Sequence, residues 1–195
     1  MIVNYFGNGC FRLQSGDTSI LLDPENNRLK ADIFLRTIIS GQAGAQEGIA
    51  GEDSDVATIA FPGEYEVKGI EVIGLPIVGE STNKFLKTAY AVTWEELKFV
   101  FLGHLSGAID ATLLEEFADP DVLILPIGGD HFLEPEVAAR IAKQLEARIV
   151  IPSFYKDPDE FLKAFGKKAE TMDKFVFKKK DIMSDKGKLI ILSQS

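Results

Sequence analysis

The chain has 195 residues, of which 46% are hydrophobic, and its net charge is −9. This length suits a single domain over residues 1–195 with a sizeable core, whereas the acidic charge argues against nucleic acid and anionic membrane surfaces as partners. A single cysteine excludes an intrachain disulfide, and the chain shows neither a signal peptide nor an apolar run of ~20 residues, so we expect a cytoplasmic protein.

The first half of the chain is predicted to be rich in strands. Polar and apolar residues alternate, as in half-buried strands, around Val3 and Tyr5, Phe11 and Leu13, and Ile20 and Leu22. Further strands are expected at residues 31–36, 56–60, 70–73, 88–93 and 97–102. Between them, residues 40–55 are rich in Gly, Ala, Gln and Glu, which predicts a mobile loop.

The second half alternates strands with helices. Strands are predicted at residues 121–126, 148–152, 175–177 and 189–192. Asp110 is suited to cap a short helix, a second helix is expected from Pro135, and a third is expected between Asp157 and Gly166. The short run Lys178-Lys179-Lys180 is interpreted as a solvated strand end. Strands followed by strand–helix alternation favour a two-sheet sandwich with helices outside.

The order of these segments resembles the metallo-β-lactamase-fold hydrolases, in particular their small, lactonase-like branch. The resemblance rests on residues 4–13, 18–24 and 31–36 and on the motif Phe61-Pro62-Gly63-Glu64-Tyr65-Glu66. It implies an α/β fold, the αββα sandwich of two mixed β-sheets flanked by helices.

The same resemblance implies a zinc pair, but the residues at its ligand positions differ. Where the family reads Thr-His-x-His-x-Asp-His, this chain reads Thr37-Ile38-Ile39-Ser40-Gly41-Gln42-Ala43. The other family ligands, two His and a bridging Asp, correspond to Gly79, Phe154 and His104 respectively. One imidazole does not hold a zinc pair, so we expect no bound metal and no cofactor, with Ile38 and Phe154 packed in the space of the metals.

Few residues remain that suit acid–base chemistry near neutral pH. His104 and His131 are the two histidines of the chain, and both follow predicted strands. Asp130 adjoins His131 and is placed to orient it, and Asp23 is a further candidate. The competing interpretation is that His104 satisfies a hydrogen bond in the former metal space and that His131 is a surface loop residue.

Two functional interpretations follow. The first is a non-catalytic pseudoenzyme that binds a protein partner or forms a homo-oligomer. The alternative is a hydrolase of the same superfamily with a metal-free or single-metal site around His104 and His131.

Overall fold

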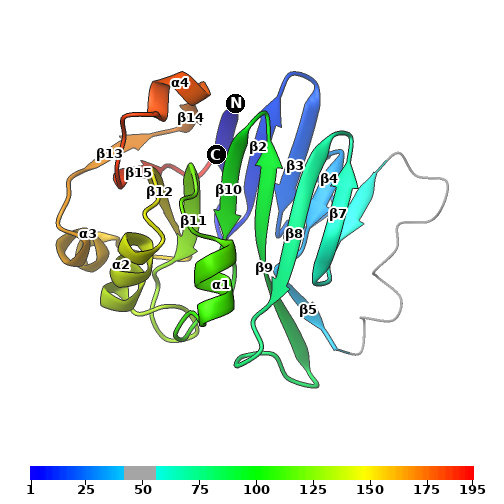
Figure 1. Cartoon of the computed structure of the whole chain (residues 1–195), viewed down its shortest axis with the longest axis horizontal. Helices are drawn as coiled ribbons and strands as arrows, with labels where there is room; N and C mark the ends of the chain where they lie inside the picture. The colour runs from blue at the N-terminus through cyan, green and yellow to red at the C-terminus, as the bar shows by residue number, and fades with distance from the viewer. Residues whose placement is uncertain (42–55) are drawn as a thin grey trace.

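Two mixed sheets form the framework of the computed structural model, which describes residues 1–41 and 56–195 (Figure 1). The smaller sheet is six-stranded. Its strands are, in spatial order, β14 (Lys174–Val176), β1 (Ile2–Tyr5), β2 (Phe11–Ser15), β3 (Thr18–Leu22), β4 (Ile33–Leu35) and β6 (Ala57–Ile59). The alternating residues of the first half therefore lie in antiparallel strands, as predicted.

The larger sheet is nine-stranded and carries the strand ends at which the candidate site lies. Its strands are, in spatial order, β13 (Ala169–Met172), β15 (Lys188–Leu192), β12 (Ile149–Ser153), β11 (Val122–Pro126), β10 (Leu97–Phe101), β9 (Phe85–Trp94), β8 (Ile70–Pro76) and β7 (Gly63–Val67), and β5 (Ile38–Ser40) pairs with β9. Glu95 and Glu96 join β9 to β10 with φ values of 51° and 61°, as in the two-residue turns that suit the twist of a hairpin. Strands β10, β11 and β12 are parallel, so their carboxyl ends lie at one edge of the sheet.

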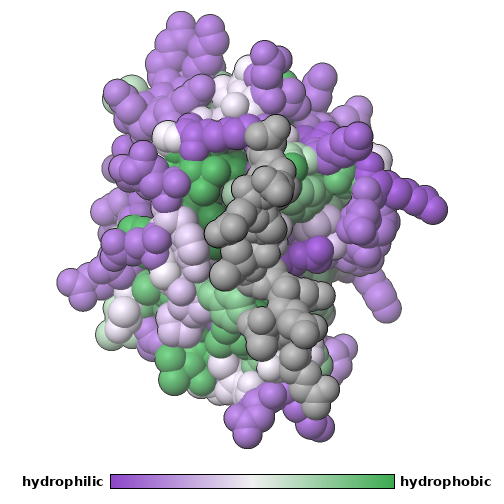
Figure 2. All heavy atoms as spheres, turned by 90° about the vertical axis from the view of Figure 1, so that its right-hand side faces the viewer, coloured by the Kyte–Doolittle hydropathy of each residue, from purple (hydrophilic) through white to green (hydrophobic). Residues whose placement is uncertain are grey.

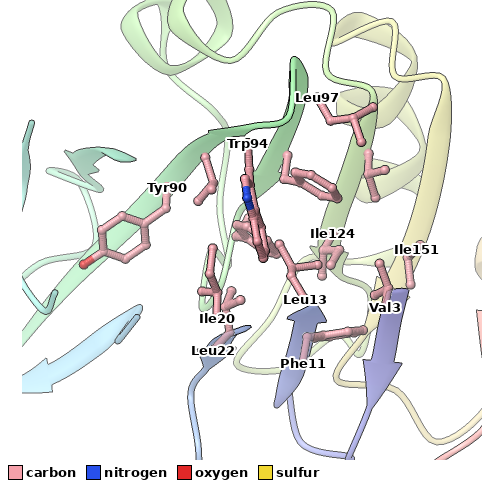
Figure 3. Packing of buried hydrophobic residues seen from close by; sticks show 14 of the residues in the cluster. Val3, Phe11, Leu13, Ile20, Leu22, Tyr90, Trp94, Leu97, Ile124 and Ile151 are labelled. Carbon is pink, nitrogen blue, oxygen red and sulfur yellow. The ribbon is translucent and has the colours of Figure 1, made fainter. Parts of the chain in front are cut away.

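A hydrophobic core fills the space between the two sheets (Figure 3). Inward residues of the smaller sheet, including Phe11, Leu13 and Ile20, meet Ile124 and Ile151 of the larger sheet. All of these side chains except Ile124 are fully buried, and Ile124 is 4% exposed. Burying each side chain contributes about 1.5–3 kcal/mol, so this layer holds the sheets together.

The helices α1 (Ala111–Glu116), α2 (Pro135–Gln144) and α3 (Asp159–Phe165) bury a second core against the outer face of the larger sheet. The Asp110 carboxylate accepts a hydrogen bond from the backbone N–H of Leu113, as predicted for a helix cap, and Gly166 ends α3 with a φ of 79°. The prediction of two mixed sheets with flanking helices is confirmed. No helix in the described residues is long and apolar enough to cross a membrane.

Two local predictions have a different outcome. The run Lys178-Lys179-Lys180 is not a strand end, because Lys179 begins the short helix α4 (Lys179–Ile182), whose Ile182 joins the core. The loop predicted at residues 40–55 falls outside the described residues, apart from Ser40 at the end of β5 and Gly41.

Strand β7 forms one edge of the larger sheet and carries charged residues. Its side chains Glu64 and Glu66 are exposed, and exposed Lys68 follows them. Figure 2 views the side of the molecule on which β7 lies, where hydrophilic residues dominate the outline and hydrophobic residues show between them. Charged side chains on an edge strand oppose pairing with another chain.

Candidate functional site

His104 lies at the carboxyl end of β10, immediately after Gly103. Its side chain is 20% exposed, and its Nδ1 atom lies 2.8 Å from Oγ1 of Thr37. Thr37 is fully buried between β4 and β5. Two strand ends far apart in the sequence therefore place a hydroxyl group against the imidazole.

Asp23 completes a hydrogen-bonded chain behind this pair. One of its carboxylate oxygens accepts a 2.7 Å hydrogen bond from the backbone N–H of Thr37, and the other accepts a 2.5 Å hydrogen bond from the Thr37 hydroxyl. The carboxylate is 10% exposed and lies 3.9 Å from Nδ1 of His104. The arrangement is thus a relay in which the hydroxyl of Thr37 joins Asp23 to His104.

Gly103 permits the close approach on which this relay depends. Its φ is 50°, and a Cβ atom at this position would lie 2.3 Å from Cβ and 2.4 Å from Oγ1 of Thr37. A side chain would therefore push the His104 loop away from Thr37. This glycine is the sequence signal for the contact between the two loops.

Burial shifts both titratable groups of the relay toward their neutral forms. The pKa of Asp23 is raised to about 6 by burial, against the lowering effect of the hydrogen bonds from Thr37 and of the charge of Arg36. The pKa of His104 is lowered to about 4 by burial and by the nearby charge of Lys87. At neutral pH the site therefore holds an ionised carboxylate and a neutral imidazole.

These protonation states determine which nitrogen of His104 carries the proton. An ionised carboxylate has no proton to donate, so the Thr37 hydroxyl donates to Asp23 and its oxygen accepts from Nδ1–H of His104. Nε2 is then the unprotonated nitrogen of the ring. Among the described residues Nε2 has no hydrogen-bond partner, and the His104 side chain is 20% exposed.

A second network fixes the backbone of the His104 loop. The Lys87 ammonium donates to the carbonyl oxygen of His104 at 2.7 Å and to the Glu80 carboxylate at 2.6 Å. Glu80 also accepts hydrogen bonds from the backbone N–H groups of Ser106 and Gly107 and from the Ser106 hydroxyl. Burial acts to raise the pKa of Glu80, but the bonds to Lys87 and to the loop together outweigh it and lower this pKa overall. The loop is therefore held at the His104 carbonyl and at the two residues Ser106 and Gly107 that follow it.

Aromatic rings cover the other side of His104. The ring centroid of Phe154 lies 4.8 Å from that of His104, and the centroid of Phe132 lies 5.8 Å from it. Phe154 thus packs against the imidazole. Its φ of 52° is unusual for a residue with a side chain.

The other predicted site residues, His131 and Asp130, lie apart from this relay. Both are exposed and line a cavity of about 580 Å³, to which Phe132 and Phe154 also contribute. In the described part of the chain, no hydrogen bond joins His131 to His104 or to Asp130. The structure therefore brings Asp23 to His104, whereas His131 and Asp130 stand at the rim of the adjoining cavity.

The described residues do not fit the zinc pair that the fold family implies. Across residues 1–41 and 56–195, no group of three or more His, Cys, Asp or Glu side chains is placed to hold a metal ion. Cys10 is buried, and burial raises the pKa of its thiol to about 11, which leaves it protonated and inert.

The relay predicts opposite dependences of stability on pH for its two groups. Because the folded-state pKa of Asp23 is raised to about 6, its contribution to the free energy of unfolding is largest at low pH and is lost as the pH rises from about 4 to 6. Because the folded-state pKa of His104 is lowered to about 4, its contribution grows as the pH rises from about 4 to 6.5. Each effect is on the order of 3 kcal/mol at most.

Urea unfolding of two variants between pH 4 and 7 separates these effects. After subtraction of the wild-type profile, Asp23→Asn is expected to gain stability with rising pH, and His104→Gln is expected to lose it. The subtraction removes the contributions of titrating groups outside the relay. Difference profiles that are flat for both variants would contradict the assignment of these protonation states.

Solved structures share this architecture along nearly the whole chain. A metallo-β-lactamase-superfamily protein from Thermotoga maritima matches with a TM-score of 0.75 and 22% sequence identity, covering 98% of this chain and 97% of that one. Igni18, a metallo hydrolase from Ignicoccus hospitalis, matches with a TM-score of 0.67 and 18% identity, covering 91% of this chain and 99% of that one. Likeness at this level of identity establishes the fold.

Relatives in sequence correct the first functional interpretation. A metal-dependent hydrolase of Thermococcus onnurineus is 26% identical over 212 positions, which cover 87% of this chain and 94% of the relative. A second, from Methanopyrus kandleri, is 31% identical over 122 positions, which cover 55% of this chain and 53% of the relative. The interpretation of the chain as a non-catalytic pseudoenzyme is wrong on this finding, because relatives matched along most of the chain are hydrolases by name. The comparisons favour the alternative, a hydrolase.

The family itself is shown by a third comparison. The family model described as a beta-lactamase superfamily domain matches residues 2–153, which is most of the chain. The match includes Asp23, Thr37 and His104, which lie in the loops after β3, β4 and β10. The chain belongs to the metallo-β-lactamase superfamily.

Proposed function

We propose that this protein is a hydrolase that uses Nε2 of His104 as a metal-free general base toward an ester or lactone carbonyl. The observation that supports it most directly is the Asp23–Thr37–His104 relay, which leaves an unprotonated nitrogen on a partly exposed imidazole at the carboxyl end of β10. Ligands of open α/β sheets commonly bind at such strand ends. The relatives' names supply the reaction class, hydrolysis.

The proposed reaction needs one proton acceptor and one water molecule. The water oxygen attacks the carbonyl carbon while Nε2 takes the proton of the water. The bond between the carbonyl carbon and the leaving oxygen then breaks, and the imidazolium returns the proton to that oxygen, giving an acid and an alcohol. The low pKa of His104 keeps the ring in its accepting form at neutral pH, but it also limits the strength of the base.

Asp23 and Thr37 act in this proposal as positioning residues. A hydroxyl that is held by an ionised carboxylate keeps the proton of the imidazole on Nδ1, as a carboxylate does for the histidine of a catalytic triad. Below about pH 6 Asp23 is protonated, and the Thr37 hydroxyl then no longer has to donate to it, so the imidazole proton is no longer kept on Nδ1. The rate is therefore expected to fall as the pH decreases through 6 and then through 4.

Replacement of His104 tests the proposal. Purified wild-type protein is expected to hydrolyse members of a panel of p-nitrophenyl esters, lactones and phosphoesters, and His104→Ala is expected to lower kcat/KM by about 10²–10⁴-fold, the usual contribution of a general base. Glu136→Gln on the exposed face of α2 is the control and should keep full activity.

Three outcomes would contradict the proposal. The first is full activity in His104→Ala, and the second is no hydrolysis of any substrate in the panel. The third is loss of activity after treatment with a chelator and recovery with zinc, which would indicate the single-metal alternative instead. His131→Ala, assayed in parallel, separates a base at His104 from one at the rim of the cavity.

The compartment and the partners remain part of the proposal. A net charge of −9 supports neutral or basic partner surfaces over nucleic acid and anionic membranes. We place the protein in the cytoplasm, where its lone cysteine would stay reduced. Self-association, predicted from the sequence, is testable by sedimentation at micromolar concentration.

A further inference from the structure

The residues that line the cavity of about 580 Å³ near His104 favour a positively charged ligand. It lies at the carboxyl ends of β11 and β12, between the loops that follow these strands. Phe132 and Phe154 line it and also contact the imidazole of His104. None of the three relay residues lines the cavity, so these two rings are what connects the cavity to the relay.

The two aromatic rings form a preformed wall, which we call the Phe132–Phe154 wall. Their planes are 19° apart and their centroids are separated by 4.2 Å. Two glycines make room for Phe154: a Cβ atom at Gly9 would lie 2.0 Å from its ring, and one at Gly128 would lie 2.0 Å from its carbonyl oxygen. The backbone of Phe154 has a φ of 52°, which is strained for a residue with a side chain, and this conformation places the ring here.

Charged side chains around this wall are mostly acidic. The cavity is lined by four carboxylates and one ammonium, namely Asp130, Glu134, Asp157, Glu160 and Lys156. Within the described ranges none of these carboxylates forms an ion pair, and the Asp157 carboxylate accepts a hydrogen bond from the backbone N–H of Asp159. Unpaired carboxylates beside an aromatic face attract an organic cation and repel an anion.

We infer that the substrate carries an alkylammonium or quaternary ammonium group, which lies in this cavity against an outer face of the stacked Phe132–Phe154 wall, while its carbonyl extends past the rings toward His104. This inference rests on the proposed hydrolysis, since it names the substrate class of the same site. The negative face of an aromatic ring holds a cation within about 6 Å of its centroid. The carboxylates of Glu134 and Glu160 add long-range attraction without a fixed ion pair.

A pair of esters of equal shape tests the role of the charge. Acetylcholine and 3,3-dimethylbutyl acetate differ in one atom, the quaternary nitrogen, which is carbon in the second. The cationic ester is expected to have a kcat/KM about tenfold higher, mainly through a lower KM. Equal kcat/KM values for the two esters would overturn the inference.

Binding of tetramethylammonium separates this inference from the proposed hydrolysis. NMR titration is expected to show saturable shifts of the Phe132 and Phe154 rings with tetramethylammonium and none with neopentyl alcohol. Phe132→Leu and the double variant Glu134→Gln/Glu160→Gln should each weaken binding at least about fivefold. The control Glu136→Gln, an exposed position in α2 outside the cavity lining, should not weaken it.

The outcomes of the two experiments are distinct. Binding of tetramethylammonium without hydrolysis of any ester would refute the proposed reaction and leave the cation site standing. Hydrolysis with no tetramethylammonium binding, or with binding unchanged in the Glu134→Gln/Glu160→Gln variant, would refute the cation site. These two glutamates are exposed, so their replacement tests the site even where Phe132→Leu fails to fold.

Discussion

Replacement of Lys87 by Met is expected to lower the free energy of unfolding by roughly 3 kcal/mol. Lys87 and Glu80 are each 15% exposed, and their charges are 2.6 Å apart. Removing one partner of a buried ion pair leaves the other charge without compensation in a poorly solvated place. The Glu80 carboxylate would keep its bonds to Ser106 and Gly107 but lose its counter-ion.

The chain offers a matched control for this substitution. Lys68 lies 2.6 Å from Asp32, the same separation, but the two side chains are 44% and 25% exposed. An ion pair at the surface contributes about 0–1 kcal/mol, so Lys68→Met should change stability little. Chemical denaturation of both variants measures the comparison, and equal losses would show that burial does not control the strength of the Lys87–Glu80 pair.

Lys87→Met also has a consequence for His104. The charge of Lys87 is one of the two causes that lower the pKa of this imidazole, and burial is the larger one. NMR titration of the ring is therefore expected to show a higher pKa in the variant, still below the ordinary value because burial remains. An unchanged pKa would mean that Lys87 acts on the loop backbone alone.

The double variant Glu80→Gln/Lys87→Met should recover part of the stability lost in Lys87→Met, because it leaves no charge without a partner.

The framework of this fold was predictable because local patterns determine it. Alternation at Phe11 and Leu13, the spacing of apolar residues in α2 and the cap at Asp110 each reflect packing or hydrogen bonding within a few residues. Strand β13 was missed, since it lies at the edge of its sheet with exposed Glu170 and Thr171 and no buried face to leave a pattern.

The candidate site was predictable only in part. Asp23 and His104 stood out as titratable residues after predicted strands, but the bridge between them is Thr37, which is 67 residues from His104 in the chain. Neither the burial of Lys87 nor its bond to the carbonyl of His104 leaves a local sequence signal. Contacts of this kind depend on which strand ends meet, and local periodicity does not specify that.

Gly103→Ala is the substitution expected to disturb the relay most without altering any of its polar groups. The new Cβ would lie 2.3 Å from Cβ of Thr37, and the backbone φ of 50° is unfavourable for alanine. Strain in the left-handed region and overpacking each cost about 1–3 kcal/mol. The loop is expected to shift, which lengthens the 2.8 Å contact between Thr37 and His104.

Gly16→Ala isolates the steric part of this effect. Gly16 has a φ of 55°, close to that of Gly103, but no atom lies within 4 Å of the position of its Cβ. Both variants therefore share the cost of the left-handed backbone, and only Gly103→Ala adds the clash with Thr37. Thermal or urea unfolding should show the larger loss for Gly103→Ala, and NMR should show that Nδ1 of His104 no longer holds its proton exclusively. Equal losses of stability in the two variants, with the proton still on Nδ1 of His104, would mean that the His104 loop accommodates a methyl group. The close approach of Gly103 to Thr37 would then not be what positions the imidazole.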